Sequence, residues 1–239
     1  MVLRQITRAI VKPFGYTTVK SGRGFRIQKK HDGEMVYLHR YAGGYEEYRQ
    51  TQIHHNKRKL DQVWADEGTL RAIVDDLKRH VPEPKRGLCH GARNGWEVQA
   101  LGRLTGAEML GTDISETATQ FPNMVVWDFH EENPDWAGRF DFIYTNSLDQ
   151  AMEPDRALRS WSKQLAPGGR IYIEHTMAHS PQGASEMDPF GAHPMCMPYL
   201  LFKWGQGHFR LAGIMELGPK SNKGLDVWVF VLTADPVAA

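Results

Sequence analysis

The chain has 239 residues, of which 41% are hydrophobic and 24% are charged, and its formal net charge is +1. This length and composition predict a globular protein with a full hydrophobic core, and no apolar run reaches the roughly 18 residues of a membrane-spanning helix. Two cysteines, Cys89 and Cys196, are too few for a disulfide framework, so a reducing cytoplasm is the expected location. The first 15 residues lack the apolar core and cleavage site of a secretory signal.

Positive charge is concentrated at the start of the chain. Residues 1–40 carry nine Lys and Arg against two acidic residues, a balance of +7, so the rest of the chain carries −6. Residues 2–11 predict a helix with its apolar side chains near one face, which Pro13 and Gly15 end. Such a segment fits an acidic or phosphorylated partner or an anionic membrane face, and a solvated basic surface is the plain alternative.

The next elements complete an N-terminal appendage. Strands at 25–30 and 35–41 flank Asp32-Gly33, which is typical of a tight hairpin turn. Helices are expected from Tyr45 to about Leu60 and from Asp66 to His80. Because Pro82 and Pro84 follow, we expect an α+β appendage over residues 1–84 and a main domain over 85–239.

The main domain alternates strands and helices. Strands are expected at 86–90, 108–113, 124–128, 140–146 and 170–175, and helical segments at 94–105, near Glu116 and at 153–165. This alternation predicts a doubly wound α/β sheet with helices on both faces. Strands 209–217 and 225–233 are joined too closely for a crossover helix, so they must pair antiparallel. Residues 176–207 are expected to be an insertion, and the sheet has seven strands, mostly parallel.

The most informative stretch is residues 86–113. A short apolar strand turns at Gly91 and Gly95 into a helix, and the next strand ends at Asp113. Bare backbone at a helix start admits a ligand, and a carboxylate about 20 residues on can accept hydrogen bonds from ribose hydroxyls. This pattern predicts a nucleoside pocket.

Residues 86–233 resemble the class I S-adenosylmethionine-dependent methyltransferases, which have a Rossmann-like fold. The likeness rests on CHGARNG, GTDIS, VVWDFH, FDFIYTNSLDQAMEP and LAPGGRIYIEH, which follow each other in the family's order. The resemblance implies that S-adenosylmethionine is the cofactor. It implies that Asp113 holds the ribose, that Ile114 packs on adenine, and that Asp128 meets the adenine amine beside Phe129. The implied cofactor-binding residues are Gly91, Ala92, Arg93, Gly95, Asp113, Ile114, Asp128, Phe129, Asn146 and Ser147.

Two positions depart from the family pattern. Cys89 stands where the family usually has an acid, and Arg93 replaces the usual middle glycine. Either Arg93 points away from the cofactor, or its guanidinium pairs with the methionine carboxylate. The third reading is a binding scaffold that has lost its cofactor. A nicotinamide enzyme is disfavoured, because GARNGW lacks the second and third glycines of GxGxxG.

The resemblance places the reaction above the ends of the fourth and fifth strands. The polar residues there are Asn146, Ser147, Asp149, Glu174, His175 and His179. We expect His175 to be the base, with Asp149 the next choice; a packed core histidine and a helix cap are the structural alternatives. His175, His179, His193 and Asp188 share a region but follow no metal-ligand spacing, so no metal is expected.

The acceptor is the least constrained feature. The segment TNSLDQ lacks the Pro-Pro-aromatic signature of base-amine methylation, and no cysteine pair suits base-carbon methylation. The basic start is similar to that of methyltransferases of surface-glycan or lipid-linked saccharide assembly, which implies weak contact of residues 1–15 with the inner membrane face. We expect a hydroxyl or amine of a small molecule or saccharide, then a nucleic acid, then a protein side chain. The oligomeric state is left open.

Overall fold

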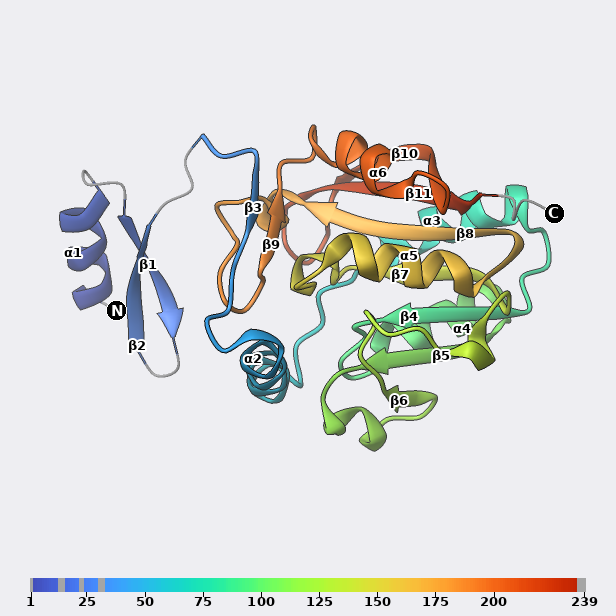
Figure 1. Cartoon of the computed structure of the whole chain (residues 1–239), viewed down its shortest axis with the longest axis horizontal. Helices are drawn as coiled ribbons and strands as arrows, with labels where there is room; N and C mark the ends of the chain where they lie inside the picture. The colour runs from blue at the N-terminus through green and yellow to red at the C-terminus, as the bar shows by residue number, and fades with distance from the viewer. Residues whose placement is uncertain (1, 13–15, 22–23, 30–32, 236–239) are drawn as a thin grey trace.

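The computed structural model describes residues 2–12, 16–21, 24–29 and 33–235 (Figure 1). Its centre is a seven-stranded sheet of order β10-β11-β8-β7-β4-β5-β6. The strands are β4 (Arg86–His90), β5 (Glu108–Asp113), β6 (Met124–Val126), β7 (Phe140–Thr145), β8 (Leu165–Thr176), β10 (Phe209–Pro219) and β11 (Asp226–Ala234). Neighbours from β6 to β8 are parallel, whereas β11 is antiparallel to both β8 and β10. The expected fold class is confirmed.

Helices cover both faces of this sheet. The core on one face contains α3 (Glu67–His80) and α4 (Trp96–Thr105), and the core on the other contains α5 (Pro154–Gln164) and α6 (Met197–Gly205). Strand β4 shows why, since neighbouring side chains on a strand point to opposite faces. Leu88 packs with the α5 side and Cys89 with the α3 side, and both are fully buried.

Local sequence explains the helix ends. The Asp66 carboxylate accepts a hydrogen bond from the Thr69 N–H at 2.9 Å and caps α3. Gly95 and Gly106 both adopt left-handed conformations at the two ends of α4, with φ of 71° and 76°. Pro154 opens α5, where its missing N–H costs no hydrogen bond. Shorter 3-10 turns are η2 (Glu116–Gln120), η3 (Pro134–Trp136), η4 (Leu148–Gln150) and η5 (Met177–His179).

Strand β8 begins five residues earlier than the sequence indicates. Leu165 already pairs with Phe140, and the register shifts before Arg170 pairs with Phe142. Pro167, Gly168 and Gly169 therefore form an irregularity inside the strand. A side chain at Gly169 would come within 3.0 Å of three backbone carbonyl oxygens, so the backbone approaches closely here.

The N-terminal segment corrects one prediction. Helix α1 (Val2–Val11) packs on a hairpin of β1 (Tyr16–Ser21) and β2 (Gly24–Lys29), at one end of the molecule in Figure 1. The expected pairing of 25–30 with 35–41 is wrong, because β3 (Val36–Leu38) pairs with β9 (Phe190–Ala192) of the insertion. Asp32 of the expected turn lies outside the described residues.

Helix α2 (Gly44–Arg58) lies beside the edge at which β4 and β5 end (Figure 1). Helix α3 contributes four buried apolar side chains to the core of the sheet: Leu70, Ile73, Val74 and Leu77. Residues 67–80 thus pack as part of the main body, and the division of the chain at residue 84 stays a prediction. Among the described residues, no helix is both long and apolar enough to cross a bilayer.

Candidate functional site

The candidate site lies where the order of the parallel strands reverses. From β4 the chain continues to β5 on one side, while β7 lies on the other side of β4. In sheets of this kind, ligands bind in the crevice beyond the carboxyl ends of the strands at this point. Two adjoining pockets open there and share the lining residues Lys59, Arg93 and Gln150. We call them the β5-side pocket, which contains Asp113, and the β8-side pocket, which contains Asp149.

The loop after β4 is shaped by left-handed residues. Gly91, Arg93 and Gly95 have φ values of 68°, 45° and 71°. A side chain at Gly91 would lie 2.6 Å from Cβ of Ser147, so only glycine fits there. The left-handed conformation costs a non-glycine residue about 1 kcal/mol or more, which Arg93 bears. Ala92 is buried and donates its N–H to the Thr112 carbonyl at 2.9 Å, so Ala92 shapes the loop and lines neither pocket.

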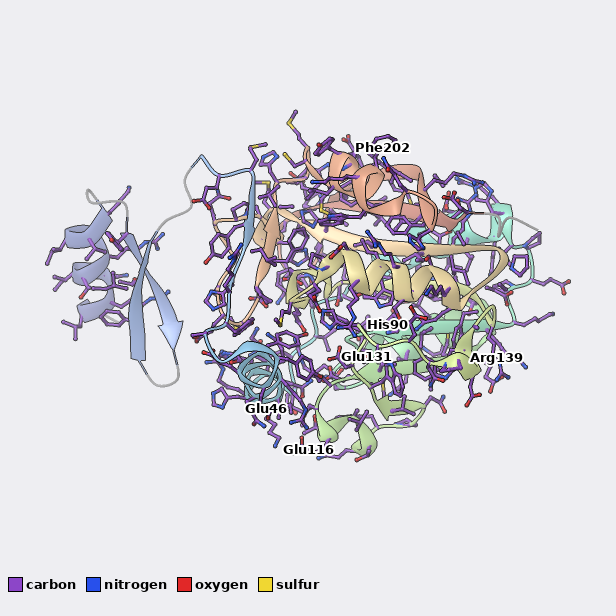
Figure 2. All side chains as sticks on the ribbon, viewed as in Figure 1. Glu46, His90, Glu116, Glu131, Arg139 and Phe202 are labelled. Atoms are coloured by element: carbon purple, nitrogen blue, oxygen red, sulfur yellow. The ribbon has the colours of Figure 1, made fainter. Side chains whose placement is uncertain are left out.

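His90, labelled inside the molecule in Figure 2, is the last residue of β4 and holds the strand end from which the loop starts. Its ring nitrogens lie 2.9 Å from Thr112 Oγ1 and 2.9 Å from Gln164 Oε1, and its ring stacks on Trp161. Burial lowers the pKa of His90 to about 4, so the imidazole is neutral at pH 7. The strand end that carries the loop is therefore fixed by uncharged contacts.

Asp113 lies in the β5-side pocket, with Ile114 beside it. Its two carboxylate oxygens accept hydrogen bonds from the Arg93 N–H and the Ser115 N–H, each at 3.0 Å. Burial raises the pKa of Asp113, and these hydrogen bonds oppose the rise. Each oxygen keeps a lone pair, so the carboxylate is held rigidly and can still accept from two neighbouring hydroxyls.

Asp128 and Phe129 line the same pocket. Asp128 accepts hydrogen bonds from the Tyr45 hydroxyl at 2.7 Å and from the His130 N–H and ring Nδ1 at 2.9 and 2.7 Å. Burial raises the pKa of Asp128, but its bonds to His130 and Tyr45 outweigh burial and hold this pKa below its ordinary value. Both oxygens already have partners, so a ligand amine would share Asp128 with Tyr45.

Helix α2 supplies most of the remaining wall of the β5-side pocket. Its lining residues are Tyr48, Gln52, His55 and Asn56, and Lys59 follows the helix. None of these five residues is among the site residues that the sequence implied. The signal was present, because residues 48, 52 and 56 are spaced four apart and therefore share one face of a polar helix. All three are buried.

The side chain of Arg93 lies between the two pockets. Its guanidinium donates to the Gln62 carbonyl at 3.0 Å, and the neighbouring Asn94 amide donates to the Leu60 carbonyl at 2.9 Å. These two hydrogen bonds join the loop after β4 to the segment that follows α2. Arg93 is among the lining residues of both pockets, and its contact with a cofactor stays a prediction.

Two carboxylates lie in the β8-side pocket. Burial raises the pKa of both Asp149 and Asp188 to about 7. For Asp149, the nearby charges of Lys59 and Arg93 and backbone hydrogen bonds oppose the rise; for Asp188, the charge of Asp149 adds to it. Oδ1 of Asp149 is buried and has no hydrogen-bond partner among the described residues. Asp149 is therefore a carboxylate that can take up a proton near neutral pH.

His179 faces Asp149 in this pocket. Its Nδ1 accepts the Thr176 N–H at 3.2 Å, so the ring proton is on Nε2, which lies 3.9 Å from Oδ2 of Asp149. Burial and the charge of Lys220 lower the pKa of His179 to about 3, which keeps the ring neutral. At 3.9 Å from a neutral ring this is a close approach and not a hydrogen bond, and it places His179 beside Asp149, four residues beyond the histidine that the sequence favours.

His175 lies outside the lining of both pockets. Its Nε2 contacts the Ala192 carbonyl at 3.0 Å, and its ring packs on Phe230. Burial lowers the pKa of His175 to about 3. These contacts match the packed core histidine that was its structural alternative.

Asn146 and Ser147 line the β8-side pocket and not the β5-side pocket, and their implied role in cofactor binding stays a prediction. Asn146 donates to Oε1 of Glu97 at 3.2 Å, and Ser147 donates to the Gly91 carbonyl at 3.1 Å.

Burial and the charge of Glu97 raise the pKa of Cys89 well above its ordinary value, so Cys89 is an uncharged core thiol. A buried carboxylate thus lies near Cys89, but it comes from α4 and not from β4.

No set of three or more His, Cys, Asp or Glu side chains in the described part of the chain is arranged to hold a metal ion. His175 and His179 pack ring to ring at 5.3 Å, and the contacts described above already use one nitrogen of each ring. The histidines of this region therefore serve packing and hydrogen bonding.

The sheet order, the strand-end crevice and the left-handed loop define a Rossmann-like fold, and the solved structures that share it include methyltransferases. The chain is similar to the 1,6-didemethyltoxoflavin-N1-methyltransferase of Burkholderia thailandensis, solved with bound 1,6-didemethyltoxoflavin and S-adenosylhomocysteine. That likeness has a TM-score of 0.60 at 17% identity and covers 92% of this chain and 95% of that one. It is also similar to the N-methyltransferase NodS of Bradyrhizobium japonicum, solved with S-adenosylhomocysteine (TM-score 0.56, 14% identity, 78% and 99% covered).

A third similar structure is the [4+2]-cyclase SpnF, with a TM-score of 0.53 at 14% identity over 70% of this chain and 81% of that one. No protein-family model and no curated protein sequence matches the chain. At these identities the comparisons show the fold. The cyclase demonstrates that one fold carries different reactions, so activity must be argued from the site.

Proposed function

We propose that the protein is an S-adenosylmethionine-dependent methyltransferase that moves a methyl group to a hydroxyl or amine of a small molecule or saccharide. The observation that carries this proposal is the junction of the two pockets at Arg93. On one side lies the rigid Asp113 carboxylate, and on the other lies Asp149, whose pKa is raised to about 7. A nucleoside site next to a proton acceptor suits methyl transfer to a hydroxyl or amine, because the acceptor loses a proton in the reaction.

The residues of the β5-side pocket fit the cofactor. Asp113 would accept both ribose hydroxyls, Ile114 and Phe129 would flank the adenine, and the backbone of Gly91 would line the cofactor site. The Arg93 guanidinium would pair with the methionine carboxylate through charge-assisted hydrogen bonds. Bound there, the cofactor supplies an electrophilic methyl group on a sulfonium centre.

The β8-side residues would prepare the acceptor. Oδ1 of Asp149 would accept the proton of an acceptor hydroxyl or amine, and the Nε2–H of His179 would orient Oδ2. Trp64 also lines this pocket, and its buried indole N–H lacks a hydrogen-bond partner among the described residues. One pocket thus contains a buried donor and a buried acceptor that both lack partners. This favours a polar ligand that accepts a hydrogen bond from the first and donates one to the second.

The comparisons support a small acceptor over a nucleic acid. The Burkholderia thailandensis structure contains bound 1,6-didemethyltoxoflavin and S-adenosylhomocysteine. In this chain, the segment after α2 and the insertion after β8 supply Trp64, His179 and Asp188 around the pocket. A walled polar pocket suits a small molecule or a terminal sugar better than a base within a duplex.

The test is calorimetry of S-adenosylmethionine binding to wild type, Asp113→Ala and Asp155→Ala. Asp155 lies exposed on α5 and is the matched control. We expect binding at about micromolar concentration for wild type and Asp155→Ala. Two lost hydrogen bonds to a charged group should weaken binding by Asp113→Ala about 100-fold or more.

Absence of binding by folded wild type would refute the proposal and leave a scaffold with a lost cofactor site. Equal binding by wild type and Asp113→Ala would place the cofactor elsewhere. Near-UV circular dichroism of each variant controls for folding, because Asp113 also holds the backbone at Arg93 and Ser115.

A further inference from the structure

Helix α1 turns its apolar side chains away from the rest of the protein. Leu3, Ile6 and Ile10 follow helical spacing and are 69%, 51% and 62% exposed. A helix of a globular protein normally buries such a stripe against the core. Here the stripe is the exposed surface of the N-terminal unit, which comprises α1, β1 and β2.

The orientation of α1 is fixed by its polar side. Arg4 donates from Nη2 to the Thr18 carbonyl of β1 at 3.1 Å, so the arginine side of the helix faces the hairpin. On the hairpin, Tyr16 and Ile27 are also 42% and 52% exposed. Five large apolar side chains are therefore open to solvent on one small unit, and such a concentration marks an interaction surface.

The N-terminal unit also carries positive charge. Arg8 of α1 and Lys12, which follows the helix, are both exposed, and residues 1–40 of the sequence carry the balance of +7. An apolar stripe on a cationic unit matches a lipid surface, where acyl chains receive the stripe and anionic headgroups receive the charges.

We propose that the N-terminal unit docks on an anionic lipid bilayer, with α1 lying in the interface. Ten residues of helix are about 15 Å long, too short to span the hydrocarbon core but sufficient for peripheral contact. One short helix gives reversible binding. This proposal does not depend on the enzymatic function, because its test measures partitioning and not methyl transfer.

The test is vesicle co-sedimentation of the full chain. Vesicles of phosphatidylcholine alone are compared with vesicles of phosphatidylcholine mixed with phosphatidylglycerol. We expect wild type to sediment with the anionic vesicles, and increasingly less so as salt is added. The double variant Ile6→Ser/Ile10→Ser should partition about tenfold more weakly or worse, because it removes apolar area that enters the interface. Ile214→Ser is the matched control, since Ile214 is 46% exposed on β10.

A second variant isolates charge. Arg8→Glu/Lys12→Glu keeps the apolar stripe and should lose binding to anionic vesicles while remaining folded. The proposal would be overturned if wild type did not sediment with anionic vesicles. It would also be overturned if wild type and Ile6→Ser/Ile10→Ser partitioned equally. Sedimentation velocity tests the other occupant of the stripe, a second copy of the chain. If wild type does not bind vesicles but forms a dimer, and Ile6→Ser/Ile10→Ser is a monomer, the stripe is a dimer interface.

Discussion

The carboxylates of the two pockets differ in how many of their oxygens accept hydrogen bonds from the protein. In the β5-side pocket, Asp113 and Asp128 accept hydrogen bonds on both oxygens, and Asp128 is held ionised by its neighbours. In the β8-side pocket, Asp149 keeps a buried oxygen without a partner, and burial raises the pKa of both Asp149 and Asp188. Hydrogen bonds on both oxygens hold the first pair in place and oppose the rise that burial causes in the pKa of Asp113, whereas Asp149 of the second pair has an oxygen free to take up a proton.

This difference separates binding from proton transfer. A carboxylate that positions a ligand must stay rigid and ionised, whereas a base must exchange a proton near the working pH. Arg93 lies between the proposed cofactor-binding residues and the proposed base, because it lines both pockets. Substitutions on either side should therefore change different measured quantities.

The largest expected effect is that of Asp149→Asn on turnover. An amide cannot accept the acceptor proton, so kcat should fall about 100-fold to 10,000-fold while cofactor affinity stays within about threefold. Wild-type kcat should rise with pH through about 7, the pKa of Asp149, since a base works deprotonated. Steady-state kinetics across this range would show the rise absent from Asp149→Asn.

The matched control for this comparison is His175→Ala. Because His175 lies outside both pockets and bonds the Ala192 carbonyl, its loss should lower thermal stability but retain the rise in kcat with pH. A rise that vanishes in His175→Ala and persists in Asp149→Asn would return the base to the histidine.

An intermediate effect is expected for Arg93→Ala. Losing a charge-assisted bond to the methionine carboxylate should weaken S-adenosylmethionine binding by about 1.5 to 3 kcal/mol, roughly tenfold to 150-fold. Calorimetry would measure it, with Arg103→Ala as an exposed arginine control on α4. Affinity unchanged in Arg93→Ala would limit the guanidinium to its bond with the Gln62 carbonyl.

The smallest effect is expected for Asp188→Asn on stability. The folded pKa of Asp188, about 7, lies above its ordinary 3.8, so folding is penalised as pH rises from about 4 to 7. Asparagine removes this penalty. Its melting temperature should match wild type at pH 4 and exceed it at pH 8 by about 3 °C or more, since 1 kcal/mol shifts a domain of this size by about 2 to 4 °C.

Calorimetric scans at both pH values would check this. A variant less stable than wild type at pH 8 would show that attraction of Asp188 to Lys59 and Arg93 outweighs its burial.

Local patterns predicted the frame of the sheet well. Strands 86–90 and 108–113 have the bounds that the sequence indicated, because buried strands flanked by glycine turns and helices are distinct signals. The loop geometry also follows from sequence, since Gly91 and Gly95 adopt the left-handed conformations that their residue type favours.

Long-range packing decided what sequence could not. The pairing of β3 with β9 joins segments more than 150 residues apart. The choice between His175 and His179 depends on where β8 ends and η5 begins, because one residue of shift moves a side chain to the other face. The pocket wall from α2 depends on how this helix docks, which its own polar sequence does not specify.

The position of the N-terminal unit has one further consequence. Figure 1 shows it on the side of the molecule toward which β4, β5 and β8 point, and the crevice with the two pockets lies at that edge of the sheet. On a bilayer, the proposed docking would hold this mouth toward the lipid. Encounter with a membrane-resident acceptor then becomes diffusion in two dimensions, and turnover would follow the surface density of the acceptor and not its bulk concentration.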